Sequence, residues 1–201
     1  MHRTILSLPK FVIFAIATSL LFPASSVYGH GFGIDTIHSV DVQGKKISIS
    51  VELPMSFEQT SEKQITITAT EDETKENAKN VTFLIGLFHE NKMIFRNYFF
   101  TSDGVLPIKV NSTQEGDITI HGEQDSLLGA WYGTESNPIM ISGPIFNSGG
   151  LYNFEIEVRT IDEPTNIIEN SGVYNADLTI VDSTEFLQKD AENNDVQFKV
   201  K

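Results

Sequence analysis

Apolar residues recur at every second position along much of the chain from residue 45 onward. Residues 45–53 alternate Ile, Ile and Val with Ser, Ser and Glu, and residues 64–70 alternate Ile, Ile and Ala with Thr. Residues 152–158 give the clearest case, in which Tyr, Phe, Ile and Val are separated by Asn and Glu. A strand with this period buries one face and exposes the other to water, as is typical of antiparallel sheets. The pattern therefore predicts sheets that each have one wet face.

Two runs, residues 81–88 and 93–100, are apolar on both faces, and the polar residues 89–92 separate them. Such runs joined by a short polar connection predict a β-hairpin at the centre of a sheet. Further strands are predicted at residues 105–110, 117–121, 139–146, 174–181 and 196–200. No stretch keeps a helical period over three turns, so the chain is predicted to be all-β.

The number and spacing of these strands predict a β-sandwich over residues 30–182. The segment Gly150-Leu-Tyr152-Asn-Phe154 resembles the corner that leads into strand F of immunoglobulin-type domains. Phe154 stands where antibody domains have a cysteine, so the likeness includes no disulfide. The resemblance implies an immunoglobulin-like antiparallel β-sandwich in which the Tyr152 hydroxyl bonds to backbone of the preceding turn. The alternative is a strand with an aromatic core position.

Residues 1–29 have the three parts of a secretory signal peptide: a basic start, an apolar run at 11–22, and small residues up to Gly29. The run is shorter than the ~20 apolar residues of a membrane span, so cleavage is favoured over a permanent anchor. Cleavage after Gly29 would make His30 the first residue, and cleavage after Ser26 is the alternative. The mature chain is therefore expected to be secreted or to lie on the extracellular face of the cell envelope, without a transmembrane anchor.

Two polar segments bear on domain organisation. Residues 71–80 form a charged insert that predicts a solvated hairpin loop. Residues 183–201 are polar as far as the predicted strand at 196–200. We expect this segment to be a polar linker followed by the start of a further domain.

Composition narrows the classes of function. The chain carries 27 acidic and 14 basic side chains, a net charge of −13. Such a surface repels phosphate backbones, and no cluster of Lys and Arg interrupts it, so nucleic acid is not expected as a partner. The absence of cysteine excludes disulfides, thiol nucleophiles and iron–sulfur clusters. No Gly-x-Ser-x-Gly motif is present, so an enzyme ranks behind a binding function.

A mature N-terminal His30 would present its α-amine and imidazole together, a nitrogen pair suited to Cu(II). His38, His89 or His121 would supply a third nitrogen. This start resembles copper enzymes that act on polysaccharides and exported copper carriers, which are immunoglobulin-like sandwiches. The chain has no His-x-His pair and no Met-rich copper motif, so an incidental terminus is the alternative.

Calcium or zinc is a second metal hypothesis. His121, Glu123 and Asp125 lie close together in sequence, and the segment 190–195 is rich in acidic and amide side chains. The dense oxygen spacing of an EF-hand-type loop is absent, which favours a plain strand-end loop.

Asn80 and Asn111 each begin an Asn-x-Ser/Thr sequon. In an exported chain these are predicted glycosylation points on loops or strand edges.

Trp131 and Tyr132 form an aromatic pair flanked by glycines at 129 and 133. Such a pair on a loop could stack on a sugar or fill a pocket of a partner. The alternative is that it folds back and closes one end of the sandwich.

The export signal followed by His-Gly-Phe-Gly-Ile-Asp at residues 30–35, together with residues 45–55 and 87–92, resembles the N-terminal region of exported, uncharacterised surface proteins of ammonia-oxidising archaea. The resemblance implies an archaeal cell envelope, where acidic, glycosylated proteins with few cysteines are usual, and it implies no activity. We therefore expect a non-enzymatic envelope module that binds envelope proteins, glycans or its own copies, with no required cofactor. The alternative is a copper-binding protein that uses His30.

Overall fold

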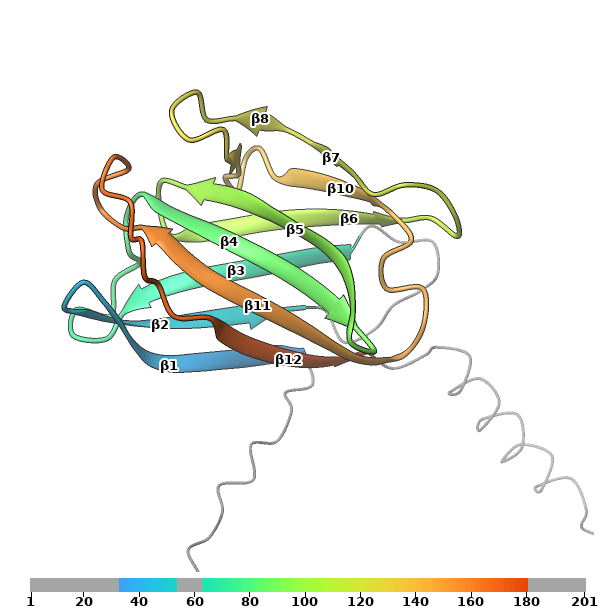
Figure 1. Cartoon of the computed structure of the whole chain (residues 1–201), viewed down its shortest axis with the longest axis horizontal. Coiled ribbons are helices and arrows are strands. Elements are labelled where there is room, and N and C mark those ends of the chain that lie inside the picture. Colours follow the sequence, from blue (N-terminus) through green and yellow to red (C-terminus); the bar gives the residue numbers. More distant parts are fainter. Residues whose placement is uncertain (1–32, 54–62, 181–201) are drawn as a thin grey trace, which may run out of the picture.

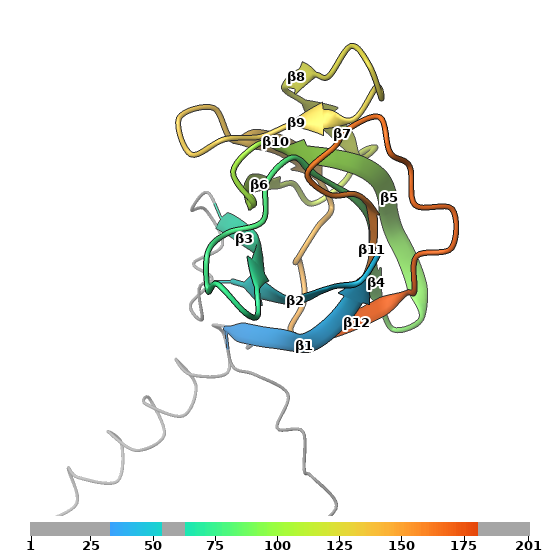
Figure 2. The same ribbon diagram turned by 90° about the vertical axis from the view of Figure 1, so that its left-hand side faces the viewer.

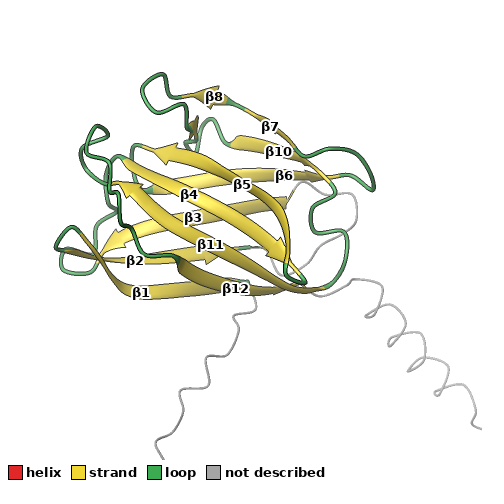
Figure 3. Cartoon of the chain, viewed as in Figure 1, coloured by secondary structure: helices red, strands yellow, loops and turns green. Residues whose placement is uncertain are grey.

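Two six-stranded β-sheets make up the part of the chain that the computed structural model describes, residues 33–53 and 63–180 (Figure 1). Every regular element in these residues is a strand (Figure 3). The all-β prediction is confirmed, and the arrangement is consistent with a β-sandwich. The predicted signal peptide at 1–29, His30 and the predicted linker at 183–201 lie outside the described residues.

The first sheet has the strand order β1-β2-β3-β6-β10-β7, and the second has the order β12-β11-β4-β5-β9-β8. The first sheet consists of β1 (Ile34–Val42), β2 (Lys45–Glu52), β3 (Lys63–Glu71), β6 (Val105–Ser112), β10 (Ile139–Gly143) and β7 (Thr119–His121). The second consists of β12 (Tyr174–Ile180), β11 (Gly150–Thr160), β4 (Val81–His89), β5 (Lys92–Thr101), β9 (Trp131–Tyr132) and β8 (Glu123–Gln124).

Both sheets are mixed, so the prediction of a purely antiparallel sandwich is wrong in two places. β10 pairs parallel to β6, and β9 pairs parallel to β5. Between β6 and β10 the chain passes through β7, crosses to the second sheet for β8 and β9, and then returns. A connection of this length lets a strand re-enter a sheet in the same direction as its neighbour.

One hydrophobic core fills the space between the sheets. The alternating residues of β2 bury Ile47, Ile49 and Val51 completely, and those of β11 bury Tyr152 and Phe154. The predicted strands therefore direct their apolar faces inward, as their period requires.

The predicted central hairpin is confirmed as β4 and β5, which lie in the middle of the second sheet. Glu90 and Asn91 form its two-residue turn, with φ angles of 51° and 61°. Positive φ at both turn residues is the geometry of a type I′ turn, whose twist suits a hairpin. Strand β4 therefore ends at His89, directly before this turn.

The charged insert turns back on β3 as a hairpin loop does: the Glu71 amide donates to the Glu76 carbonyl oxygen at 2.8 Å, and Thr70 and Asn77 form an antiparallel bridge. After this turn the chain leaves for the other sheet. Residues 72–80 carry the chain from β3 in the first sheet to β4 in the second. Ala78, the single apolar residue of this charged stretch, is completely buried, and its amide donates to the Ala69 carbonyl oxygen at 2.9 Å. Anchoring of Ala78 in the core turns the segment into a connection between sheets.

The margins of the sandwich are closed differently on its two sides (Figure 2). On one side β1 and β12 meet, and the Asp35 carboxylate accepts a 2.8 Å hydrogen bond from the Asp177 backbone amide. On the other side one continuous segment pairs with the first sheet as β7 and with the second sheet as β8. Contacts between the two sheets at their margins make the edge strands less available for pairing with other chains.

Asp72 connects the segment 72–80 to the first sheet through its side chain. We expect the free energy of unfolding to depend on the protonation of this carboxyl. Hydrogen bonds from the Ser48 hydroxyl at 2.6 Å and the Ser39 hydroxyl at 2.9 Å hold the pKa of Asp72 below its ordinary value of 3.8. A carboxyl with a lowered folded pKa stabilises the fold above its unfolded pKa, and this contribution is lost as the pH falls through the folded value.

We therefore expect wild type to be more stable than Asp72→Asn near neutral pH, with a difference that shrinks as the pH falls below 3.8. Denaturant unfolding over a pH series measures it. A difference that stays constant down to the most acidic sample would contradict the assignment.

Candidate functional site

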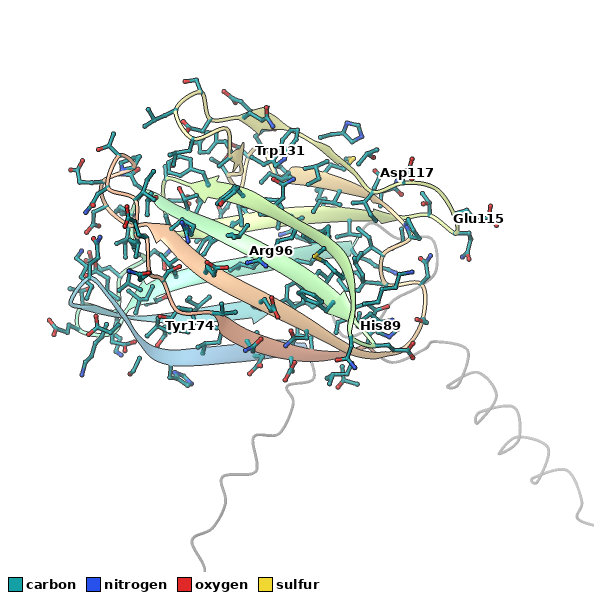
Figure 4. All side chains as sticks on the ribbon, in the orientation of Figure 1. His89, Arg96, Glu115, Asp117, Trp131 and Tyr174 are labelled. Carbon is teal, nitrogen blue, oxygen red and sulfur yellow. The ribbon has the colours of Figure 1, made fainter. Side chains whose placement is uncertain are left out.

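His89 ends β4 at one end of the sandwich, beside the turn to β5 (Figure 4). Its imidazole stacks on the Tyr152 ring, with centroids 4.2 Å apart and planes 9° apart. A Cβ atom at Gly150 would lie 2.9 Å from His89 Nε2, so the glycine leaves the room that the imidazole occupies. Pairing of β11 with β4 brings His89 directly opposite Tyr152.

Tyr152 is the fixed base of this stack. Its side chain is almost completely buried, its hydroxyl donates to the Ser148 carbonyl oxygen at 3.0 Å, and Phe146 packs edge-on against its ring. Burial raises the pKa of the hydroxyl, which keeps it protonated as a donor. The predicted hydrogen bond from Tyr152 to the preceding turn is confirmed.

Two hollows flank His89. The first, about 490 Å³, lies toward β11, where Asn153 and Glu155 line it beside Leu151. The second, about 440 Å³, lies toward β5, where Met93 lines it. His89 and Glu90 line both hollows. We call the surface formed by His89, Glu90, Met93, Leu151 and Asn153 the His89 face.

The His89 face combines exposed apolar groups with polar ones. Met93 is 53% exposed and Leu151 is 45% exposed, although each belongs to a strand that contributes to the core on its other face. Carboxylates of Glu90 and Glu155 and the amide of Asn153 lie next to them. Apolar contact area with a few fixed polar groups is the composition of a binding surface.

The structure does not gather the histidines predicted as metal ligands. His38 lies exposed on β1 and His121 lies exposed on β7, at opposite margins of the first sheet, whereas His89 belongs to the second sheet. Among the described residues, no group of three or more His, Cys, Asp or Glu side chains could hold a metal ion. Because His30 lies outside these residues, copper binding through it stays a prediction.

Asp125 has a local structural role. Its carboxylate accepts hydrogen bonds from the amides of Leu127 and Leu128 at 3.1 and 2.7 Å. These bonds shape the turn between β8 and β9, which favours the strand-end loop over a calcium site formed with His121 and Glu123.

Trp131 and Tyr132 form the short strand β9 rather than a loop. Trp131 is half-buried against the core, and Tyr132 packs on Phe100 with ring centroids 5.5 Å apart while its hydroxyl lies 3.2 Å from Ser102 Oγ. This geometry favours the alternative in which the pair covers the sandwich. Contact of the pair with a partner stays a prediction.

The two sequons differ in accessibility. The Asn80 side-chain amide donates to the Asp162 carbonyl oxygen at 2.8 Å and is partly buried. Asn111 lies exposed near the end of β6.

If the chain is exported and glycosylated, we expect the glycan to be attached to Asn111. Intact mass should lose the excess in Asn111→Gln and keep it in Asn80→Gln, and the same spectra identify the first residue of the mature chain. Loss of the glycan mass in Asn80→Gln alone would contradict this expectation.

The sequence named His89 as a metal ligand but did not reveal the His89 face. The one indication in the sequence was the alternation of residues 150–158, which places the apolar Leu151 on the outer face of the sheet. The hollows could not be predicted, because they form where β4, β5, β11 and the segment before β11 meet.

No helix within residues 33–53 and 63–180 is long and apolar enough to cross a membrane. Comparison of the chain with known proteins gives no match: no family model, no curated protein and no solved structure is significantly similar to it.

Proposed function

We propose that the protein is a non-enzymatic, exported module of the cell envelope that binds another envelope protein, a glycan or a second copy of itself through the His89 face. The observation that carries the proposal is the pair of hollows on either side of His89, whose rims expose Met93 and Leu151. Exposed apolar side chains grouped in a concave surface are typical of contact sites.

Rigidity of the surface supports this role. The His89 ring is held between the Gly150 backbone and the Tyr152 ring, and the Tyr152 hydroxyl is bonded to Ser148. A partner therefore meets side chains that are already ordered, which lowers the entropy lost on binding.

The proposal includes export through residues 1–29 and an immunoglobulin-like arrangement of the sandwich. The bond from Tyr152 to Ser148 supports the second point, because a tyrosine at this position of immunoglobulin-type domains makes the same kind of bond.

A sedimentation assay tests the proposal. The purified mature chain is mixed with envelopes of the cells that produce it, and bound protein is measured over a concentration series. We expect saturable binding that Met93→Glu and Leu151→Glu each weaken at least about tenfold, because burial of such a side chain contributes about 1.5–3 kcal/mol and tenfold corresponds to about 1.4 kcal/mol.

Leu127→Glu is the matched control. Leu127 is 60% exposed and belongs to the loop between β8 and β9. This loop lies at the other end of the sandwich from the turn between β4 and β5 (Figure 1). Unchanged binding of this variant is expected. Absence of saturable binding by wild type, or equal loss in all three variants, would refute the role of the His89 face.

A further inference from the structure

A third hollow, of about 310 Å³, lies on the second sheet at the end opposite His89. It is bounded by the outer faces of β4, β5 and β11, the loop between β8 and β9, and the loop between β11 and β12. We call it the Arg159 groove, and its lining is Thr82, Tyr98, Leu128, Arg159, Thr160 and Ile167. Its volume is at the lower end of the range of ligand pockets, about 300–1,000 Å³.

Arg159 lines this groove, and its side chain carries one unpaired donor. Its Nη1 pairs with Glu157 Oε2 at 3.2 Å, whereas its Nε is closed to solvent and has no hydrogen-bond partner within the described part of the chain. An unsatisfied buried donor costs about 1–3 kcal/mol, and native proteins retain few of them. An acceptor supplied from outside the chain would remove this cost.

The local charge favours an anionic acceptor. Glu157 Oε1 pairs with Arg96 at 2.5 Å while its Oε2 pairs with Arg159, so two cations share one carboxylate. Among the described residues that line the groove, Arg159 is the one charged side chain. Two guanidinium groups and one carboxylate leave this ion-pair group with a charge of +1, in a chain of net charge −13.

The remaining walls favour an aliphatic ligand. Ile167 is 53% exposed, Tyr98 is 42% exposed, and Leu128 lies half-buried beside them. A short alkyl chain covering these side chains would remove apolar surface from water at about 25 cal/mol per Å².

We propose that the Arg159 groove binds an aliphatic monocarboxylate of medium chain length. The carboxylate accepts hydrogen bonds from the Arg159 guanidinium, which remains paired with Glu157, and the alkyl chain packs on Tyr98, Leu128 and Ile167. A guanidinium presents its donors as a planar fork that matches a carboxylate. Because Nε is closed to solvent, its contact with the ligand requires the Arg159 side chain, which is 22% exposed, to rotate on binding.

The test is a titration of the isotope-labelled mature chain with octanoate, followed by amide chemical shifts. Octanol and octylammonium serve as ligands of the same length without the negative charge. We expect octanoate to shift the amides of Tyr98, Thr160 and Ile167 in a saturable way, and each uncharged or cationic analogue to bind at least about tenfold more weakly, as loss of a charge-assisted hydrogen bond requires.

Variants assign the carboxylate. Arg159→Met should weaken octanoate binding at least about tenfold, whereas Arg96→Gln, which alters the same ion-pair group outside the groove, should change it less than about threefold. Ile167→Ser, in an exposed loop, should weaken binding without affecting the fold.

Three outcomes would overturn the proposal: no saturable shifts with octanoate, equal affinity for octanol, or unchanged affinity in Arg159→Met. Shifts confined to the His89 face would also overturn it. The proposal is independent of the envelope-binding role, because the two sites lie at opposite ends of the β4–β11 pair and are lined by different residues.

Discussion

Phe83→Ala is expected to lower the free energy of unfolding by about 3–5 kcal/mol. Phe83 is completely buried on the inner face of β4, at the centre of the second sheet. Its removal leaves a cavity between sheets that packing on both sides prevents from collapsing. Urea denaturation monitored by circular dichroism measures the loss.

Phe88→Ala is the matched control on the same strand. Phe88 lies half-buried on the outer face of β4, where its ring covers Gly86. We expect a loss below about 2 kcal/mol, because part of this ring already contacts water. Equal losses in the two variants would mean that β4 does not direct Phe83 into the core.

Gly104→Ala should be the most damaging small substitution, with a loss above about 3 kcal/mol. Gly104 has a φ angle of 78° in the turn between β5 and β6, where a Cβ atom would overlap the Ala78 carbonyl oxygen and lie 3.1 Å from the Ala69 carbonyl oxygen. The substitution would push the connection at 72–80 away from β3.

Gly44→Ala is the control that measures the cost of the backbone conformation without the steric overlap. Gly44 has a similar φ angle of 84°, but nothing lies within 4 Å of a Cβ atom there. We expect it to cost about 1–2 kcal/mol, the penalty of a left-handed conformation alone. Thermal or urea unfolding of both variants measures the difference. A Gly104→Ala protein as stable as Gly44→Ala would contradict the close approach of the three backbone segments.

The local sequence pattern was sufficient to predict the position of a strand wherever polar and apolar residues follow a regular pattern. β2, β3 and β11 follow the alternation closely, and the β4–β5 hairpin follows from two apolar runs around a short polar turn. β1 was missed because a bulge between Ile37 and Val40, with Ser39 at a φ angle of 55°, moves the apolar positions out of step. β9 has two residues, too few to show any period.

The order and direction of the strands in the two sheets could not be predicted from the same pattern. The connection at 72–80 is charged like a hairpin loop, and its destination in the other sheet depends on Ala78 reaching the core. Parallel pairing of β10 with β6 depends on where the chain returns after its excursion through β8 and β9. Such choices are decided by contacts between residues far apart in sequence, which a single period does not encode.

Site prediction from residue type had a similar limit. His89 was named for its imidazole, yet its position depends on Gly150 and Tyr152, more than 60 residues further along the chain. Arg159 belongs to no sequence motif, and its unpaired Nε is evident only from the three-dimensional surroundings of the side chain. Both sites arise where strands of the second sheet meet loops at its ends.

Site-specific photo-cross-linking on the producing cells would locate the contact surface directly. A photoreactive amino acid replaces Leu151 on the His89 face or, as control, Leu127 at the opposite end; both native side chains are exposed. The proposed role predicts a discrete, light-dependent product from position 151 that excess unlabelled protein removes, and none from position 127. Products from position 127 alone, or none from either position, would contradict binding through the His89 face.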